Sequence, residues 1–348
     1  MRNPGEVDFP KAGLSASNEY RWKVEPDYPS SLKFERRRFP VNIVRSLTSL
    51  PESIRGGTVA IGNFDGVHLG HARIVARLVE MARRVRGPAV VFTFDPHPVR
   101  VLCPEKVPPP LTWTERKAEL LGELGVDWTI AYPTDEALLE LTPEEFFRSI
   151  VCDQLRAAAV VEGPNFRFGH NREGTVDTLR ELARAEGIEA DVVSPYEFEG
   201  AMISSSRVRQ AIAKGNVESA ARMLTRPYRI RGLITHGAKR GAQIGFPTAN
   251  VGAIDTLLPA EGVYAGRGHA LGRSWPAAIN IGPNPTFDEL GLKVEAHLLG
   301  FDGSLYGEPL EIDFLSKLRD VQKFATVEAM KEQLRQDAAT ALKIASTL

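Results

Sequence analysis

Two histidines close behind a glycine loop could bind the same ligand. The stretch from Thr58 to His71 reads TVAIGNFDGVHLGH, and His68 lies three residues before His71. Residues three apart are neighbours on a helix surface, so both imidazoles could face one ligand at the first turn of a helix. A loop that leads into a helix N-terminus offers free N–H groups, and the usual ligand of such a loop is a phosphate. The spacing therefore favours a phosphate site.

This glycine loop does not match the two commonest phosphate-binding motifs. It lacks the GxxxxGK[ST] of a P-loop, and GNFDGV differs from the GxGxxG of dinucleotide sites. A pair of histidines could instead ligate a metal, although no third ligand is evident nearby in the sequence. Glycine loops after strands are also common in α/β proteins. The loop alone therefore leaves these alternatives open.

A second set of phosphate-binding residue types lies in ISSSRVRQAI, residues 203–212. Three serines precede a predicted helix that carries Arg207 and Arg209. One serine at a helix start is most simply an N-cap. Three serines with two arginines suit a triphosphate better, because hydroxyls and guanidinium groups both bind phosphate oxygens.

The C-terminal half contains a candidate metal and phosphate site in HGAKRGAQIGFPTANV, residues 236–251. Thr248 and Asn250 are two residues apart, so on a strand their side chains share one face. A hydroxyl and an amide oxygen are hard ligands that suit Mg²⁺ bound together with substrate phosphates. Four glycines with Lys239 and Arg240 predict a mobile, basic flap, for which a solvated hairpin tip is the simpler alternative.

Strands and helices alternate in the part of the chain that must hold the histidines. Thr112 with Glu115, and Thr142 with Glu145, predict capping boxes at two helix starts. The alternation predicts a parallel sheet with helices on both faces. Ligands bind beyond the carboxyl ends of such strands, where the glycine loop, TFDPHP, EGPNFRFG and ISSSRVR all fall. The predicted strands are 58–62, 89–94, 126–132, 157–162 and 188–194, and the predicted helices are 71–85, 114–124, 143–155 and 175–186.

From Arg226 onward the pattern changes to short strands separated by glycine turns. No long helix is predicted until about residues 326–345. This pattern predicts an antiparallel barrel closed by a C-terminal helix. Residues 1–40 show little periodicity and contain repeated prolines, so we expect a flexible arm. The expected segments are the arm 1–40, an α/β domain 41–224 and a barrel domain 225–348.

Composition indicates a globular protein of two domains without a charge-driven partner. The chain has 348 residues, of which 43% are hydrophobic and 25% charged, and its formal net charge is -1. This charge gives no electrostatic basis for binding nucleic acid or an anionic membrane. Two cysteines form no CxxC pair, no apolar run approaches about 18 residues, and the N-terminal segment lacks a signal-peptide core. We expect a cytoplasmic monomer or weak oligomer.

The motifs of the first domain resemble a known family. GNFDGVHLGH contains the HxGH core of a nucleotidyltransferase signature, and FDPHP, NFRFG and ISSSRVR follow in the order typical of bacterial bifunctional riboflavin kinase/FAD synthetases. The resemblance covers about residues 41 to 330 and implies a Rossmann-like, doubly wound domain that adenylylates FMN. The residues that it implies are His68 and His71 for the triphosphate, Asn165 for the flavin nucleotide, Ser205, Ser206 and Arg209 for the ATP phosphates, and Gly62, Phe64, Asp65 and Gly66 for ATP or flavin. The family often has threonine at the position of Ser206, a mild departure because a hydroxyl is kept.

The barrel motifs resemble riboflavin kinase. GFPTAN matches its signature, and NIGPNPTF and VEAHLLGFDGSLYG resemble its later motifs. By this resemblance Glu295 takes the proton of the riboflavin 5′-hydroxyl, which is a poor nucleophile without a base. An exposed strand carboxylate is the plain alternative. The family's flap usually reads RGR, and Ala242 replaces its second arginine, which puts kinase efficiency in question. The other implied residues are Thr248 and Asn250 for Mg²⁺ and ATP, and Lys239, Gly245 and Pro247 for ATP.

The resemblance implies two linked reactions that form a flavin cofactor. The barrel would convert riboflavin and ATP to FMN and ADP, and the α/β domain would convert FMN and ATP to FAD and pyrophosphate, with Mg²⁺ in both steps. The FMN phosphate is largely dianionic at pH 7, because its second pKa is about 6, so it needs no general base. One alternative is an FAD synthetase with a weak or inactive kinase barrel, and another is a flavin-binding sensor without catalysis. Intact His68, His71 and Glu295 favour the enzyme.

Overall fold

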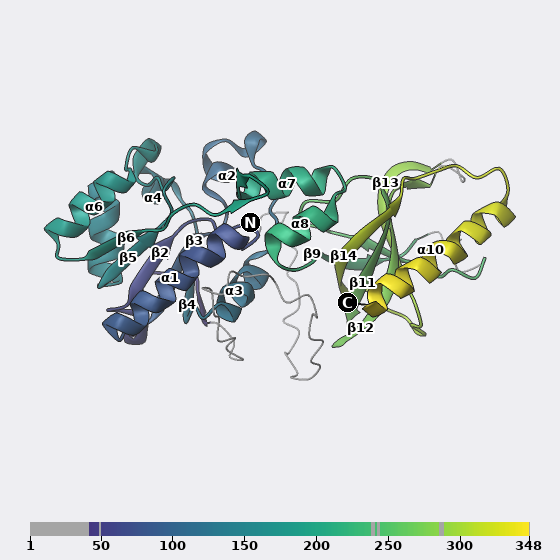
Figure 1. The fold of residues 1–348 in the computed structure, drawn as a ribbon, viewed down its shortest axis with the longest axis horizontal. Coiled ribbons are helices and arrows are strands. Elements are labelled where there is room, and N and C mark those ends of the chain that lie inside the picture. Colours follow the sequence, from purple (N-terminus) through teal and green to yellow (C-terminus); the bar gives the residue numbers. More distant parts are fainter. Residues whose placement is uncertain (1–41, 49, 238–240, 242–243, 285–288, 348) are drawn as a thin grey trace, which may run out of the picture. The chain divides into compact units, whose positions relative to one another are not determined.

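The computed structural model describes residues 42–48, 50–237, 241, 244–284 and 289–347 (Figure 1). Contacts along the chain divide it into two compact units, one ending at Ser205 and the other beginning at Ser206. The expected arm, residues 1–40, lies outside the described residues. None of the helices in the described ranges has the length and apolar character needed to cross a membrane.

The first unit is built on a six-stranded parallel sheet. Its strand order is β1-β4-β3-β2-β5-β6, and all five neighbouring pairs are parallel. From β2 the chain runs through β3 and β4 toward one edge, and later through β5 and β6 toward the other edge, so the sheet is doubly wound as predicted. The strands are β1 Asn42–Val44, β2 Thr58–Ile61, β3 Ala89–Phe94, β4 Trp128–Tyr132, β5 Ala159–Glu162 and β6 Glu189–Val192.

Helices cover both faces of this sheet. On one side lie α1 Leu69–Val85 and α3 Thr114–Glu123, and on the other lie α5 Pro143–Phe146, its π-helical continuation η3 Phe147–Gln154, and α6 Val176–Ala185. Successive side chains of a strand point to opposite faces. Accordingly, Ala60 of β2 belongs to the core with α1 and α3, whereas Val59 and Ile61 belong to the core with α5, η3 and α6.

Two of the helices test the predicted capping boxes. Thr142 and Glu145 form the box at the start of α5, with Pro143 in the first turn, as predicted. The prediction for Thr112 and Glu115 is wrong, because α3 begins at Thr114 and has no side-chain cap. The Thr112 hydroxyl instead bonds to the glycine loop. The Thr112 hydroxyl therefore makes a tertiary contact instead of capping α3.

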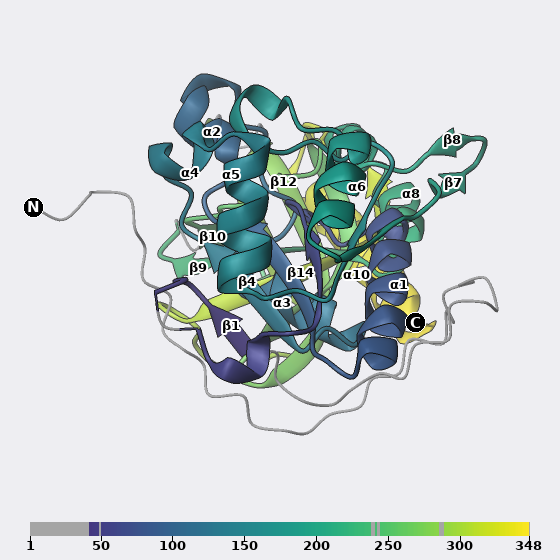
Figure 2. The ribbon, with the colours of Figure 1, turned by 90° about the vertical axis from the view of Figure 1, so that its left-hand side faces the viewer.

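Shorter elements complete the first unit. A small hairpin projects from it in Figure 2, formed by β7 Glu197–Phe198 and β8 Ala201–Met202. The remaining short helices are η1 Glu52–Ile54, α2 Pro98–Leu102, η2 Pro104–Lys106, α4 Glu136–Glu140 and η4 His170–Arg172.

The second unit contains a closed six-stranded barrel. The strand order is β10-β13-β12-β11-β14-β9, and every neighbouring pair is antiparallel, which confirms the predicted fold class. Alternate residues of the first strand, such as Tyr228 and Ile230, are buried, as expected for the inward face of a barrel. The strands are β9 Tyr228–Thr235, β10 Ala249–Gly252, β11 Gly262–Ala270, β12 Arg273–Asn284, β13 Glu289–Leu298 and β14 Pro309–Arg319.

The predicted C-terminal helix is α10 Val327–Thr347, which packs against β11 and β12. A buried ion pair fastens it to the next strand of the barrel. The Arg319 guanidinium of β14 donates to the carboxylate of Asp337, with a shortest distance of 2.8 Å. Asp337 is only 4% exposed, so this pair is shielded from solvent.

Two helices, α7 Ser205–Ala213 and α8 Val217–Leu224, precede the barrel and contact it. The Ala260 N–H donates to the carbonyl of Ile212, and the Glu218 carboxylate of α8 accepts from the Ser316 hydroxyl at 2.6 Å. Because α7 and α8 contact the barrel, the boundary between the two compact units falls after Ser205. The predicted domain boundary falls after residue 224. That boundary, which concerns independently folding domains, stays a prediction.

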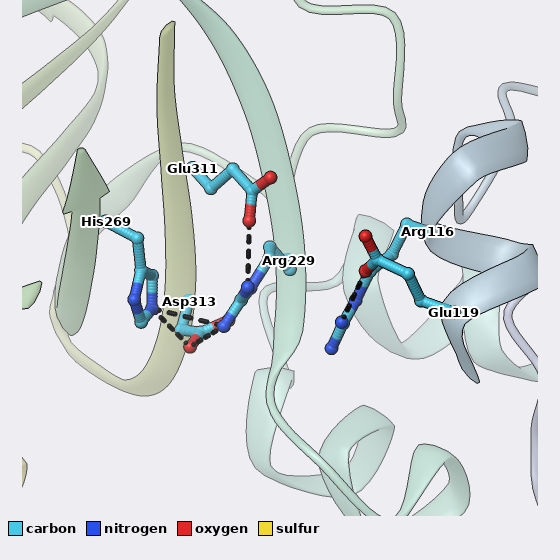
Figure 3. A network of polar contacts seen from close by, with 6 residues as sticks. All are labelled: Arg116, Glu119, Arg229, His269, Glu311 and Asp313. Atoms are coloured by element: carbon cyan, nitrogen blue, oxygen red, sulfur yellow. Dashed lines mark hydrogen bonds and ion pairs between the residues drawn. The ribbon is translucent and has the colours of Figure 1, made fainter. Parts of the chain in front are cut away.

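An ionic cluster around the buried Asp313 lies on the outer side of the barrel wall (Figure 3). Arg229 of β9 binds both carboxylate oxygens of Asp313 on β14, at 2.6 and 2.7 Å, and also binds Glu311 at 2.8 Å. His269 of β11 contacts Asp313 at 2.8 Å. Burial alone would raise the pKa of Asp313, but the charge of Arg229 and hydrogen bonds from His269 and Arg229 bring it well below the usual range. The cluster joins three adjacent strands.

Candidate functional sites

The glycine loop after β2 is anchored by its own aspartate. The Asp65 carboxylate accepts hydrogen bonds from the backbone N–H groups of Leu111 and Thr112, at 3.0 and 3.1 Å. The Thr112 hydroxyl contacts Asp65 Oδ1 and also accepts from the Gly66 N–H, both at 3.2 Å. Asp65 is 6% exposed. These contacts bind the loop to the segment before α3, so fixing the loop is one role of Asp65.

The loop backbone is strained at two non-glycine residues. Phe64 and Val67 have φ values of 45° and 41°, in the left-handed region that residues with a Cβ rarely adopt. Both side chains are 3% exposed, and the Phe64 ring lies 5.1 Å from the His71 ring. Such strain persists only where the surroundings hold it, and it is common at binding sites. The buried Phe64 ring thus supports the conformation of the loop.

The two histidines are brought together as the spacing predicts. Their rings are stacked, with centroids 3.7 Å apart and planes 15° from parallel. His68 is the N-cap of α1, one residue before the helix, and its Nδ1 accepts from the His71 N–H at 3.4 Å. A neutral imidazole that accepts at Nδ1 carries its proton on Nε2. His68 therefore caps the helix with one nitrogen and keeps an N–H donor on the other.

The serine motif meets the glycine loop through its second serine. Ser205 begins α7, and its hydroxyl donates to the backbone carbonyl of Asp65 at 2.9 Å. Ser206 and Arg209 follow on the same helix. Asn165 lies in the turn after β5, where its side-chain amide contacts the sulfur of Met202 at 3.6 Å. The ends of β2 and β5 and the start of α7 thus carry the predicted residues of this site.

Two buried ionisable residues near the loop were missed in the sequence. Lys117 of α3 is 7% exposed and donates to the Thr93 hydroxyl at 3.2 Å, and that hydroxyl donates to the Asn63 carbonyl at 3.1 Å. Burial lowers the pKa of Lys117, and the charges of Asp65 and Asp95 oppose this shift. The available signal was a lysine within an otherwise apolar stripe of the predicted helix.

Glu162, the last residue of β5, is the other missed residue. It is 3% exposed, and its carboxylate accepts from the Ile61 N–H at 2.6 Å. Burial raises the pKa of Glu162 well above its ordinary value, although hydrogen bonds from the Ile61 and Gly163 backbones oppose the shift. The signal in the sequence was a carboxylate that directly follows the apolar run AAAVV.

In the barrel, the candidate base and a candidate metal ligand are cross-strand neighbours. Asn250 of β10 is paired with Glu295 of β13, and Glu295 is paired on its other side with Asn280 of β12. Residues directly opposite in an antiparallel ladder have Cβ atoms about 5 Å apart. Glu295 thus lies between Asn250 of β10 and Asn280 of β12. Thr248 is the residue directly before β10.

Two glycines give the candidate metal ligands their space. A Cβ atom built on Gly237 would lie 2.1 Å from the Asn250 amide nitrogen, and one built on Gly241 would lie 2.3 Å from the Phe246 carbonyl and 3.4 Å from the Thr248 hydroxyl. Side chains at either position would therefore displace the motif. The backbone of this stretch therefore approaches Asn250 closely at Gly237. At Gly241 it approaches Phe246 and Thr248.

The GFPTAN segment is held by a histidine two residues after Glu295. His297 Nδ1 donates to the carbonyl of Pro247 at 2.7 Å, and the Phe246 ring meets the His297 ring edge-on at 5.6 Å. Gly245 has a φ of 91°, a conformation that favours glycine. These contacts place Thr248 at the end of a fixed turn. Lys239, which was expected to contact ATP, and Ala242 lie outside the described residues.

The donor set in the barrel fits Mg²⁺ bound mainly by substrate. Thr248 and Asn250 offer one hydroxyl and one amide oxygen, and Mg²⁺ usually takes one or two protein oxygens together with waters and phosphates. Over the described part of the chain, no cluster of three or more His, Cys, Asp or Glu side chains could hold a metal ion. Residues of this kind would bind a magnesium–nucleotide complex rather than the bare ion.

Comparisons with known proteins assign a class to each unit. A family model for FAD synthetase matches residues 50–207, and one for riboflavin kinase matches residues 224–345. The relatives include bifunctional riboflavin kinase/FMN adenylyltransferases from Pseudomonas fluorescens, 38% identical over 88% of this chain and 98% of that protein, and from Bacillus subtilis, 33% identical over 83% and 93%. The chain belongs to this family of bifunctional riboflavin kinase/FMN adenylyltransferases.

A solved structure shares the fold over most of the chain. It is described as a macrolide-efflux protein from Streptococcus pneumoniae, and it is 29% identical, with a TM-score of 0.77 over 87% of this chain and 99% of that one. The likeness supports the arrangement of strands and helices found in each unit.

Proposed function

We propose that the barrel phosphorylates riboflavin to FMN and that the first unit, with α7, adenylylates FMN to FAD. Each step uses one ATP. For the kinase, the proposal is supported by the pairing of Asn250 with Glu295 on neighbouring strands. This pairing also argues against a weak or inactive barrel.

In the kinase step, Glu295 is the general base. Its carboxylate accepts the proton of the riboflavin 5′-hydroxyl while that oxygen attacks the γ-phosphorus of ATP, and ADP leaves. Thr248 and Asn250 would hold the nucleotide together with Mg²⁺, and the ion would supply positive charge to the phosphates. His297, through the Pro247 carbonyl, keeps Thr248 in place.

In the adenylylation step, an oxygen of the FMN phosphate attacks the α-phosphorus of ATP, and pyrophosphate leaves. No base is needed, because the phosphate is already ionised. The task is to bring like charges together and to stabilise the charge that develops. The Nε2–H of His68, together with His71, is suited to this, and Ser205, Ser206 and Arg209 hold the remaining phosphates.

Three further features belong to the proposal. Mg²⁺ serves both steps, the protein works in the cytoplasm, and it is a monomer or weak oligomer.

Lys239, Gly245 and Pro247 contact the ATP of the kinase step, while Gly62, Phe64 and Gly66 shape the nucleotide site after β2. Asn165 contacts the flavin nucleotide.

Chromatography of products tests the function directly. The purified chain is incubated with riboflavin, ATP and Mg²⁺, and separately with FMN, ATP and Mg²⁺. FMN followed by FAD in the first mixture, and FAD in the second, are the expected results. FAD from FMN alone would indicate a synthetase with an inactive barrel. Tight flavin binding without either product would instead indicate a sensor.

A further inference from the structure

The strands β2 and β5 flank the point at which the winding of the sheet reverses. From β2 the chain proceeds to β3 on one side, and β5 enters on the other side and proceeds to β6. Crevices at such switch points are where doubly wound sheets bind ligands. The loop after β2 leads to His68 and His71, and the loop after β5 carries Asn165. The spacing of these two strand ends therefore sets the spacing of the two loops.

The backbone ladder between these strands stops before their ends. Paired residues are Thr58 with Ala159 and Val59 with Val160. The same register would place Ile61 opposite Glu162. There, the Glu162 side chain accepts the Ile61 N–H at 2.6 Å in place of a backbone carbonyl.

On the opposite side of β2, the Gly62 N–H donates to the Phe92 carbonyl of β3 at 2.9 Å. The base of the glycine loop is thus held to β3 by backbone and to β5 by one side chain. Glu162 is the only link of this kind that the described contacts show between Ile61 and β5.

Burying the Glu162 side chain at the end of β5 has an unfavourable free energy. Glu162 is 3% exposed, and burying an ionisable group is unfavourable unless it is well bonded. An apolar residue would be buried without that penalty, but it would leave the Ile61 N–H without an acceptor. Glu162 is buried despite this cost, and its hydrogen bond to the Ile61 N–H links β2 to β5 at the switch point.

We propose that Glu162 is a positioning residue for adenylyl transfer, which fixes the glycine loop relative to the Asn165 loop by accepting the Ile61 N–H. The proposal rests on the proposed adenylyltransferase function. One loop serves the ATP phosphates and the other serves FMN, so a change in their separation misaligns the attacking oxygen and the α-phosphorus. Misplacement by about 1 Å can cost about 10²-fold in rate.

Three substitutions in the full-length chain separate the acceptor from the charge. Glu162→Gln keeps an acceptor oxygen of the same reach, Glu162→Asp keeps the carboxyl group but shortens the side chain, and Glu162→Leu removes both. Glu189→Leu, at an exposed carboxylate of β6, is the matched control. For each variant, kcat and KM are measured for FAD formation from FMN and ATP, together with kcat for FMN formation from riboflavin.

The expected order of kcat for FAD formation is wild type, then Glu162→Gln, then Glu162→Asp and Glu162→Leu. The Leu variant should lose about 10²-fold in kcat, with KM for ATP changed by about threefold at most, and its kinase kcat should be unchanged. A Leu variant within about twofold of wild type, or a Gln variant no better than Asp, would overturn the proposal. If the Leu variant fails to fold, the comparison of Gln with Asp decides. If wild type itself makes no FAD from FMN, the proposed function has failed instead.

Discussion

Asn250 and Glu295 lie directly opposite each other in the antiparallel ladder of β10 and β13. This one pairing connects two motifs that are 45 residues apart in the chain, GFPTAN and VEAHLL. Strand register is strict in a closed barrel, because a slip of one residue turns every side chain to the other face. The barrel fold therefore fixes which carboxylate lies beside the GFPTAN segment.

The first prediction concerns the role of Glu295 as base. Glu295→Gln keeps the shape of the side chain and removes proton acceptance, so FMN formation should fall by about 10²-fold or more. FAD formation from FMN should be unchanged, because that chemistry belongs to the other unit. Initial rates with riboflavin and with FMN measure both. Glu328→Gln, on the exposed face of α10, is the control and should leave both rates intact. Near-normal FMN formation by Glu295→Gln would show that this carboxylate is not the base.

The second prediction separates the two roles of His68. His68→Asn keeps a side-chain oxygen that can cap α1 but loses the imidazole, whereas His68→Ala loses both. Both variants should lose most FAD formation and keep FMN formation. Only the Ala variant should also be less stable, by about 1 kcal/mol for the lost cap. Steady-state rates and urea unfolding test these points. Equal FAD rates in wild type and His68→Asn would mean that the imidazole serves the helix and not the phosphates.

The sequence predicted the sheet and the barrel better than it predicted their edges. Alternating apolar strands and amphipathic helices are strong signals, and five of the six strands of the first sheet were found. β1 was missed because its three residues, Asn42–Val44, carry no period, and its place at the sheet edge depends on pairing with β4. The capping box at Thr112 failed for a similar reason, since Asp65, far away in sequence, uses that hydroxyl.

The placement of the candidate site residues was predictable where it depends on a local element alone, and their roles stay predictions. The histidine pair needs only a helix start, and Asn250 needs only a strand, whereas Thr248 lies one residue before β10 and not on it. Glu162 and Lys117 were missed because their roles exist only after β5 and α3 pack beside β2 and β3. The Ile61 N–H and the Thr93 hydroxyl that they bind lie 101 and 24 residues away.

A third prediction concerns the ionic cluster of the barrel. Asp313→Asn would remove the buried carboxylate that pairs with the partly exposed Arg229, and breaking a buried ion pair costs about 3–5 kcal/mol. Glu311→Gln removes the other carboxylate that pairs with Arg229. The Glu311 side chain is 37% exposed, so this change should cost at most about 1 kcal/mol. Urea unfolding followed at the barrel compares the two variants. A loss for Asp313→Asn no larger than that for Glu311→Gln would show that the cluster adds little stability.

The fourth prediction follows from the raised pKa of Glu162. Burial raises this pKa, so the folded state holds the proton more tightly than the unfolded chain, whose glutamate titrates near pH 4.3. The associated stability is complete below about pH 4.3 and is lost as pH rises through the folded-state pKa, with a slope of at most about 1.4 kcal/mol per pH unit. Glu162→Gln removes this dependence. The free energy of unfolding of wild type, relative to Glu162→Gln, should therefore fall from pH 5 upward. A flat difference would contradict the burial of an ionisable group here.

The last prediction concerns which fragments fold. Val217, Ala220, Met223 and Leu224 of α8 are at most 2% exposed, and α8 packs on β9 and β14. Burying a side chain such as Val, Leu or Met contributes about 1.5–3 kcal/mol, so α8 supplies several kcal/mol of a total that is usually about 5–15. Residues 217–348 should therefore fold and make FMN from riboflavin, whereas residues 225–348 should melt at a clearly lower temperature and make little. Residues 41–224 should make FAD from FMN and nothing from riboflavin.

Circular dichroism melts and product chromatography of the three fragments test this division. Equal melting temperatures for 217–348 and 225–348 would show that α8 is not part of the barrel's folding unit and would favour the boundary predicted after residue 224. FAD made by a folded barrel fragment, or FMN made by residues 41–224, would overturn the assignment of chemistry to units. The motifs argue against that outcome, because Thr248, Asn250 and Glu295 all lie after Leu224, while His68, His71 and Asn165 all lie before it.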